Sequence, residues 1–337
     1  MKSKTAKPLF LSASRIDTFL SCSQKYAARY LLKLPDAGND GSRRGSTCHD
    51  VLELLQKPRH FKRFRDAITH DNCREVPALW RLIRRFAKKY GVDDPTNLAL
   101  IDEFIMVGLK HGFRGPKGTK KLEVEREFTI EVNRGGRRYN VRGFIDRVSH
   151  VSDEKGLWLE CADYKSSVGK MEAPDDTIQS QVYQLALRHL YPEIKRRTFH
   201  YLFLRFPKVP VQEVTPMSDD QLDGLEWYLT TIQETMEKFT LANQGDNLMA
   251  FNGDQGNIRK HCGREGVKKD GSPAHICSAR MPMDYWVIVD GDGELVEGAF
   301  TEQALAPKLK KGQKTDKRRY NGCAAYFNKE GKPRNFN

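Results

Sequence analysis

The sequence predicts an α/β protein, because strand-like and helix-like patterns both recur along its 337 residues. Residues 139–148 and 157–165 are rich in β-branched and aromatic side chains, as β-strands are, and the polar turn SHVSDEKG joins them. Near the N-terminus, apolar side chains recur at helical spacing from Ile16 to Leu31. A chain of this length can bury a full core, either as one large domain or as one domain with an elaborated second region.

The N-terminal half reads mainly as helices. Residues 1–11 are expected to form a short flexible arm, after which Ser12 or Ser14 caps the first helix. The segment PDAGNDGSRRG predicts a loop, and a second helix begins at about Thr47. Residues 57–112 have a mixed helical pattern and are interpreted as a helical insertion.

The core of the fold is expected over about residues 120–243. The segment LEVEREFTIEV alternates as a strand does, and NRGGRR predicts a hairpin turn that leads into residues 139–148. A helix is predicted from Pro174 to about His189, then a strand over RRTFHYLFLRF and a long amphipathic helix over residues 218–243.

The C-terminal extension, residues 281–337, changes character. The segment MDYWVIVDGDGELVEGAF predicts a small hairpin, and APKLKKGQKTDKRRYNG is strongly basic. The basic segment fits a DNA-contacting appendage or a disordered tail, and the sequence leaves both open.

Two acidic residues and a lysine converge in the predicted hairpin. If its turn is centred near Glu154 and Lys155, antiparallel pairing sets Asp146 opposite Asp163, with Cβ atoms roughly 5 Å apart. Lys165 lies two positions beyond Asp163 and therefore on the same sheet face. Such close carboxylates repel unless a cation lies between them, and hard divalent cations prefer oxygen ligands.

This group suits metal-assisted attack on a phosphodiester. The alternative is a surface hairpin with solvated charges, but these charges interrupt apolar strands, where burial without a partner is costly. On the preceding strand, Glu125 and Glu127 are both candidates to point toward the same patch.

Three further side chains are candidate site residues, and the local pattern alone does not decide between a functional and a structural role for them. His49 lies on the second predicted helix with Glu53 four residues on, and imidazole serves there as a structural group or as a ligand. Gln179 and Tyr183, at positions i and i+4, share one face of a helix and could reach a phosphate. Ordinary helix surface is the alternative for that pair.

Composition limits the class of partner and the compartment. The formal net charge is +13 and the isoelectric point is about 9.3, which favours a polyanion. A membrane partner is not expected, because no apolar run approaches the roughly 20 residues of a spanning helix. The segment MKSKTAKPLF does not resemble a signal peptide, and seven cysteines without export signals indicate a reducing compartment, so a cytoplasmic location is expected.

The motif order resembles the PD-(D/E)xK nuclease superfamily. The order His49, Asp146 in GFIDRV, Asp163-Tyr164-Lys165 in ADYKSS, and Gln179 with Tyr183 is similar to the RecB-type exonuclease branch, which includes CRISPR-associated four-cysteine nucleases and phage relatives. The resemblance covers roughly residues 10–280 and implies a restriction-endonuclease-like core, a mixed sheet flanked by helices, within a nuclease domain over residues 12–280.

The resemblance also implies roles for these residues. Mg²⁺ or Mn²⁺ would be held by His49, Asp146, Asp163 and the Tyr164 carbonyl. Lys165 would be the catalytic lysine, with a supporting pair that consists of Gln179 and Tyr183.

The same branch often holds a 4Fe–4S cluster with one cysteine before the core and three after it. This chain has one cysteine before and three after, namely Cys22, Cys262, Cys277 and Cys323. Four thiolates also suit structural zinc, and a clasp without metal is a third possibility. The sequence departs from the branch in the long gap between Cys277 and Cys323. We interpret Cys48, Cys73 and Cys161 as plain buried thiols.

Taken together, the sequence predicts a metal-dependent DNA exonuclease that acts on single-stranded DNA or DNA ends. The setting would be recombination, repair, phage DNA metabolism or CRISPR adaptation, with a protein partner from one of these pathways. An endonuclease of the same fold and a non-catalytic DNA-binding scaffold are the alternatives, because end selection depends on channel shape and not on metal ligands.

Overall fold

The computed structural model describes residues 8–36, 38–240, 262–267, 273–275, 277–323 and 330–332. The chain divides into two compact units, one made of Met1–Ala13 and Gly38–Thr230 and the other of Ser14–Ala37 and Thr231–Asn337. This division differs from the expected domains, residues 12–280 and 281–337, because the second unit already begins at Thr231 and also includes Ser14–Ala37.

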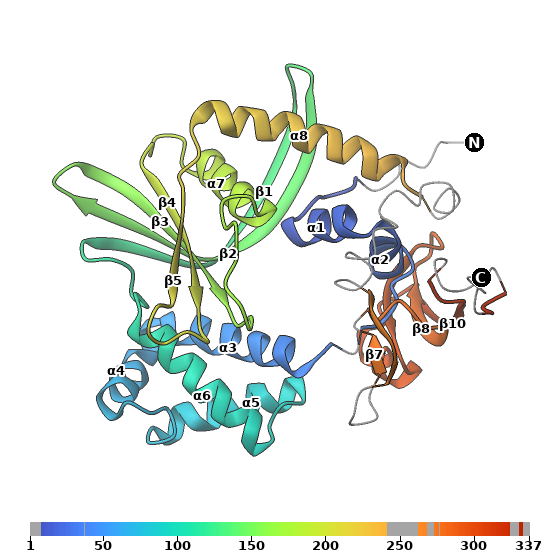
Figure 1. Cartoon of the computed structure of the whole chain (residues 1–337), viewed down its shortest axis with the longest axis horizontal. Helices are drawn as coiled ribbons and strands as arrows, with labels where there is room; N and C mark the ends of the chain where they lie inside the picture. Colours follow the sequence, from blue (N-terminus) through green and yellow to red (C-terminus); the bar gives the residue numbers. More distant parts are fainter. Residues whose placement is uncertain are drawn as a thin grey trace. The chain divides into compact units, whose positions relative to one another are not determined.

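The first unit is built on a five-stranded mixed sheet with the order β1-β2-β3-β4-β5 (Figure 1). Neighbouring strands are antiparallel except β3 and β4, which are parallel. The strands are β1 (Thr119–Arg134), β2 (Arg137–Asp153), β3 (Gly156–Lys165), β4 (Arg197–Phe203) and β5 (Val211–Val214).

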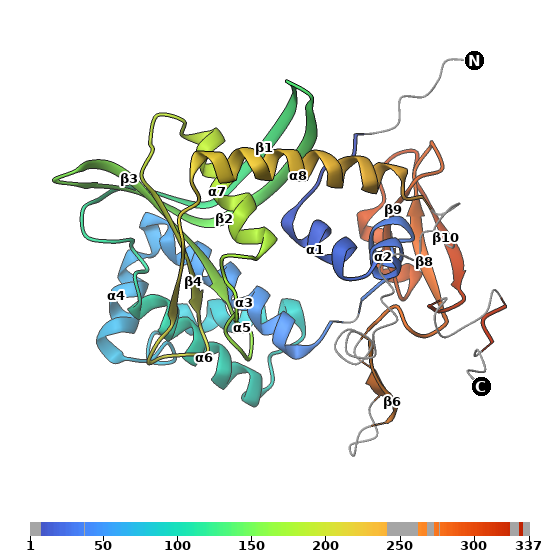
Figure 2. The same ribbon diagram turned by 45° about the horizontal axis from the view of Figure 1, so that its top comes forward.

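Helices cover both faces of this sheet, which confirms the predicted α/β fold with a restriction-endonuclease-like core (Figures 1 and 2). One face packs against α3 (Asp40–Gln56), α4 (Phe61–His70), α5 (Pro77–Tyr90) and α6 (Pro95–Lys110), in a core that includes Tyr164, Leu202 and Leu204 from the strands. On the other face lies α7 (Ile178–Leu190), whose Tyr183 ring meets Phe128 of β1 and Phe199 of β4 edge to face.

The hairpin register is the one expected from the sequence. β2 ends at Asp153 and β3 begins at Gly156, and these two residues pair across the turn. The pairs continue to Arg147 opposite Ala162, so the next step along both strands sets Asp146 opposite Asp163. The prediction from the turn is therefore confirmed.

The loop predicted over residues 35–45 is wrong in its second half, because α3 begins at Asp40. The Asn39 side chain accepts a hydrogen bond from the Ser42 amide at 2.9 Å and caps the helix. Glycines and serines thus fill the first turns of a helix here. The cap gives α3 two further turns ahead of His49.

The other predicted helices of this unit are present with small shifts. The proposed insertion, residues 57–112, contains a short 3-10 helix (Pro58–His60) and α4 to α6. The helix expected from Pro174 begins later, at Ile178, because the Thr177 side chain caps it by accepting from the Ser180 amide. The long helix over residues 218–243 is α8 (Asp219–Lys238), which belongs to both units.

The predicted flexible arm ends in an ordered residue. Residues 1–7 lie outside the described part, but Leu11 is fully buried and bridges Val141 of β2. Its amide donates to the Asn140 carbonyl at 2.8 Å and its carbonyl accepts from the Arg142 amide at 3.0 Å. The chain is thus held to the sheet before α1 (Ala13–Ser21) begins.

The second unit contains a three-stranded antiparallel sheet with the order β10-β8-β9. Its strands are β8 (Met283–Val289), β9 (Leu295–Ala299) and β10 (Lys314–Tyr320), so the predicted hairpin is confirmed and part of the basic segment is a strand. The same unit also contains α2 (Ser23–Tyr26), a π-helix (Ala27–Leu31), 3-10 helices (Glu302–Ala304 and Ala306–Lys308) and the pair β6 (Gly263–Val267) and β7 (Pro273–His275). Ala28 and Leu34 pack on the sheet with Tyr285 and Val287.

Candidate active site

Asp146, Asp163 and Lys165 come together on the adjacent strands β2 and β3. The two carboxylates are nearly buried, with 7% of Asp146 and 3% of Asp163 exposed. The Lys165 ammonium lies 2.6 Å from Asp163 Oδ2. Burial of two acids and one base on adjacent strands is costly without compensating charge, so the group is unlike a solvated surface hairpin.

Asp146 is oriented by the neighbouring strand and by α3. The amide of Tyr164 donates to Asp146 Oδ2 at 2.7 Å, and Nδ1 of His49 lies 3.5 Å from the same oxygen. The other ring nitrogen of His49, Nε2, lies 3.0 Å from the Tyr164 carbonyl oxygen. His49, Asp146 and the Tyr164 carbonyl are thus neighbours.

A glutamine joins the catalytic lysine candidate to its acid. Gln179 Oε1 accepts from Lys165 Nζ at 2.6 Å, while Gln179 Nε2 donates to Asp163 Oδ1 at 2.7 Å and to the Tyr183 hydroxyl at 3.0 Å. The amide therefore fixes the carboxylate and the ammonium relative to each other. Helical spacing predicted that Gln179 and Tyr183 share a face, and they do.

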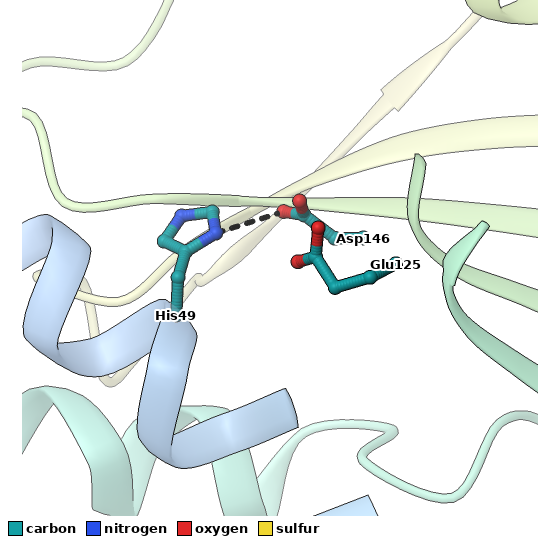
Figure 3. Close-up of side chains that lie close together, drawn as sticks. All are labelled: His49, Glu125 and Asp146. Carbon is teal, nitrogen blue, oxygen red and sulfur yellow. Dashed lines mark ion pairs between the residues drawn. The ribbon is translucent and has the colours of Figure 1, made fainter. Parts of the chain in front are cut away.

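Glu125 on β1 also reaches this group. One ligand atom each from His49, Glu125 and Asp146 lie within 4.8 Å of one another, and the close-up shows their side chains converging (Figure 3). Glu125 and Glu127 could not be told apart from the sequence, and Glu127 is exposed. In the register of β1 with β2, Glu125 lies between the pairs Val124 with Arg147 and Arg126 with Ile145, and therefore opposite Asp146.

The acids of the site have strongly perturbed pKa values. Burial, together with the Asp146 carboxylate, raises the pKa of Asp163 to about 6 against the effect of Lys165. Burial and the same carboxylate raise the pKa of Glu125 to about 7. For Asp146, His49 and the Tyr164 amide outweigh burial and hold its pKa below the usual range.

The pKa of His49 is also raised. Burial lowers the pKa of His49, but the charge and hydrogen bond of Asp146 outweigh it and raise the pKa to about 9. Negative charge has thus accumulated at the site beyond what His49 and Lys165 offset. A divalent cation fits the donor set of His49, Glu125 and Asp146 with the nearby Tyr164 carbonyl, since carboxylate, imidazole and carbonyl groups are all ligands that Mg²⁺ or Mn²⁺ accepts.

Comparison with protein families agrees with this geometry. The model of the PD-(D/E)XK nuclease superfamily matches residues 10–263 of the chain. The chain belongs to the PD-(D/E)XK nuclease superfamily. As a member, it is a metal-dependent nuclease, a phosphodiester hydrolase with DNA as the expected substrate.

Comparisons of this nuclease with solved structures and with curated proteins gave the following results. A structural match, entitled "Crystal structure of SSO0001", shares 17% sequence identity with a TM-score of 0.25, and the alignment covers 56% of this chain and 76% of that one. No curated protein matches the chain. In the described part of the nuclease, no helix combines the length and apolarity required to span a membrane.

A second group of candidate residues lies in the other unit of the nuclease. Cys22, Cys262, Cys277 and Cys323 line one small cavity, although they are spread over 300 residues of sequence. Cys22 caps α2, and its sulfur accepts from the Lys25 amide at 3.4 Å. The four cysteines selected from the sequence are therefore neighbours in space.

The remaining cysteines lie elsewhere. Cys48, Cys73 and Cys161 are fully buried in the first unit, and burial raises the pKa of all three thiols. This agrees with the prediction that they are plain buried thiols. They are consequently poor nucleophiles and poor metal ligands.

Proposed function

We propose that this nuclease is a RecB-type exonuclease that hydrolyses phosphodiester bonds in single-stranded DNA or at DNA ends. The observation that carries the proposal is the Gln179 amide, which binds Asp163 and Lys165 at once and adds Tyr183 to the site. The residue order along the chain supports the same branch. Recombination, repair, phage DNA metabolism and CRISPR adaptation are the settings in which such an enzyme would act.

The residues divide into ligands and groups that act on the phosphate. His49, Asp146, Asp163 and the Tyr164 carbonyl would hold Mg²⁺ or Mn²⁺. The cation would neutralise charge on the scissile phosphate and lower the pKa of an attacking water. Lys165, which contacts Asp163 and Gln179, would stabilise the negative charge that develops during attack. Tyr183 accepts from Gln179 and keeps that amide in position.

A cleavage assay on circular and linear single-stranded DNA tests the proposal. We expect loss of end-labelled linear DNA with Mg²⁺ or Mn²⁺, no loss of circles, and no loss of either substrate with EDTA. Cleavage of circular DNA would show that the enzyme is an endonuclease and not an exonuclease. If metal-loaded protein binds DNA but cleaves neither substrate, the alternative of a non-catalytic DNA-binding scaffold would be favoured.

We further propose that Cys22, Cys262, Cys277 and Cys323 hold a 4Fe–4S cluster. Four thiolates are the ligand set of such clusters, and their sulfurs are commonly stabilised by backbone amides, as Cys22 is by Lys25. A structural zinc ion would use the same four ligands. The cluster would join the α1–α2 region to the C-terminal strands within the second unit.

The iron content of anaerobically purified protein tests this proposal. We expect about four iron atoms per chain and absorbance near 400 nm for the wild type, and loss of both in Cys22→Ser. Cys73→Ala, which removes a thiol from the first unit, should retain both. Protein that contains zinc in place of iron, or no metal at all, would contradict the cluster.

A further inference from the structure

We propose that Glu125 is an additional ligand of the divalent cation, and that the unusual backbone at this residue exists to bring its carboxylate to the site. The proposal rests on the metal-dependent chemistry proposed above. The motif set of the branch does not include Glu125, and the strand pattern alone did not separate it from Glu127.

The first observation is position. Glu125 comes from β1, whereas Asp146 comes from β2 and His49 from α3, yet one ligand atom of each lies within 4.8 Å of the others (Figure 3). In the part of the chain that the structure describes, the Glu125 carboxylate makes no hydrogen bond or ion pair that would explain its place. It lies instead beside another carboxylate, where like charges repel.

The second observation is the backbone. Glu125 has a φ of +47°, although the flanking pairs of β1, Val124 with Arg147 and Arg126 with Ile145, are in regular register. Side chains with a Cβ rarely adopt this conformation, and a glycine would adopt it without strain. Strained residues of this kind concentrate at functional sites.

The strain changes the direction of side chains along β1. Glu123 accepts a hydrogen bond from Tyr191 at the end of α7, and Phe128 contacts Tyr183 within α7. These two positions are five residues apart and would face opposite sides of a regular strand. The left-handed residue between them therefore resets the alternation of β1, and it does so at the position where Glu125 lies opposite Asp146.

The consequence is a third carboxylate for the cation. A further anionic oxygen raises the affinity of a site for divalent ions, because ligand charge and number set that affinity. Without the cation, the same carboxylate adds repulsion and backbone strain. Glu125 thus lowers the stability of the metal-free protein and raises the affinity of the site for the cation.

Mn²⁺ binding to the full chain without nucleic acid tests this inference, with electron paramagnetic resonance of free Mn²⁺ as the readout. We expect Glu125→Gln to weaken binding about tenfold or more. Glu127→Gln, two positions along the same strand, should bind within about twofold of wild type. Equal affinity in wild type and Glu125→Gln would overturn the inference, and so would wild-type protein that binds no Mn²⁺.

Glu125→Gly separates the strain from the ligand. This variant keeps the backbone and removes the carboxylate, so its melting temperature in EDTA should equal or exceed that of wild type. The increase in melting temperature that Mn²⁺ produces in wild type should be largely lost. A full Mn²⁺-dependent increase in this variant would contradict the proposal.

The Mn²⁺ readouts are independent of DNA cleavage. A protein that binds Mn²⁺ through Glu125 but cuts neither linear nor circular DNA would refute the exonuclease and leave the ligand assignment intact. If the wild type degrades linear DNA and Glu125→Gln binds Mn²⁺ as tightly as the wild type, the ligand assignment is refuted and the exonuclease is left intact.

Discussion

Lys165→Ala is expected to lower the rate of DNA cleavage by about 10²- to 10³-fold, the usual cost of removing one group that stabilises developing charge. Lys165 is held between Asp163 Oδ2 and Gln179 Oε1, each 2.6 Å away, so its charge is fixed in place before substrate binds. Phosphate contacts from many basic residues generally supply most of the affinity for DNA, and the chain has 57 Lys and Arg residues, so DNA affinity should change by less than about threefold. Single-turnover cleavage and a filter-binding assay measure the two quantities.

The matched control is Lys155→Ala, which removes an exposed lysine from the turn of the same hairpin. Its cleavage rate should equal that of wild type. Asp146→Asn and Asp163→Asn should be as inactive as Lys165→Ala and should also lose Mn²⁺ binding, which Lys165→Ala should retain. Cleavage at the wild-type rate in Lys165→Ala would remove this residue from the mechanism.

Arg147→Ala is expected to destabilise the first unit by about 3–5 kcal/mol, because it leaves a buried carboxylate without its partner. Arg147 follows Asp146 in β2 and pairs with Glu160 of β3, and both side chains are at least nine-tenths buried. Ser149 donates to the same carboxylate at 2.6 Å, and Arg147 also donates to the Gly112 carbonyl. The pair thus holds together the two strands that carry Asp146 and Asp163.

Urea unfolding measures this effect, with Arg196→Ala as the control. Arg196 pairs with Asp153 at the exposed end of the same hairpin, 2.6 Å apart, and exposed pairs contribute about 0–1 kcal/mol. The double variant Arg147→Met with Glu160→Met removes both charges and should recover much of the loss. A single Arg147→Ala variant as stable as wild type would show that the ion pair does not hold the hairpin.

The sequence by itself determined the centre of the site, because that part depends on local rules. The turn at Glu154 and Lys155 fixes the hairpin register and thereby sets Asp146 opposite Asp163. The strand period adds Lys165 to their face, and the helix period keeps Gln179 and Tyr183 together. None of these placements requires knowledge of distant parts of the chain. The start of α3 was missed because its Asn39 cap lies within a run of glycines and polar residues that also suits a loop.

Only the tertiary structure decided the residues that come from far along the chain or break a local rule. His49 reaches the Tyr164 carbonyl across 115 positions, which no periodicity predicts. Cys22 lies beside three cysteines from beyond residue 260, because Ser14–Ala37 and the C-terminal part of the chain belong to the same compact unit. Glu125 joins the site through a left-handed residue inside a strand. Strand patterns assume a regular backbone, and the positive φ of Glu125 departs from it.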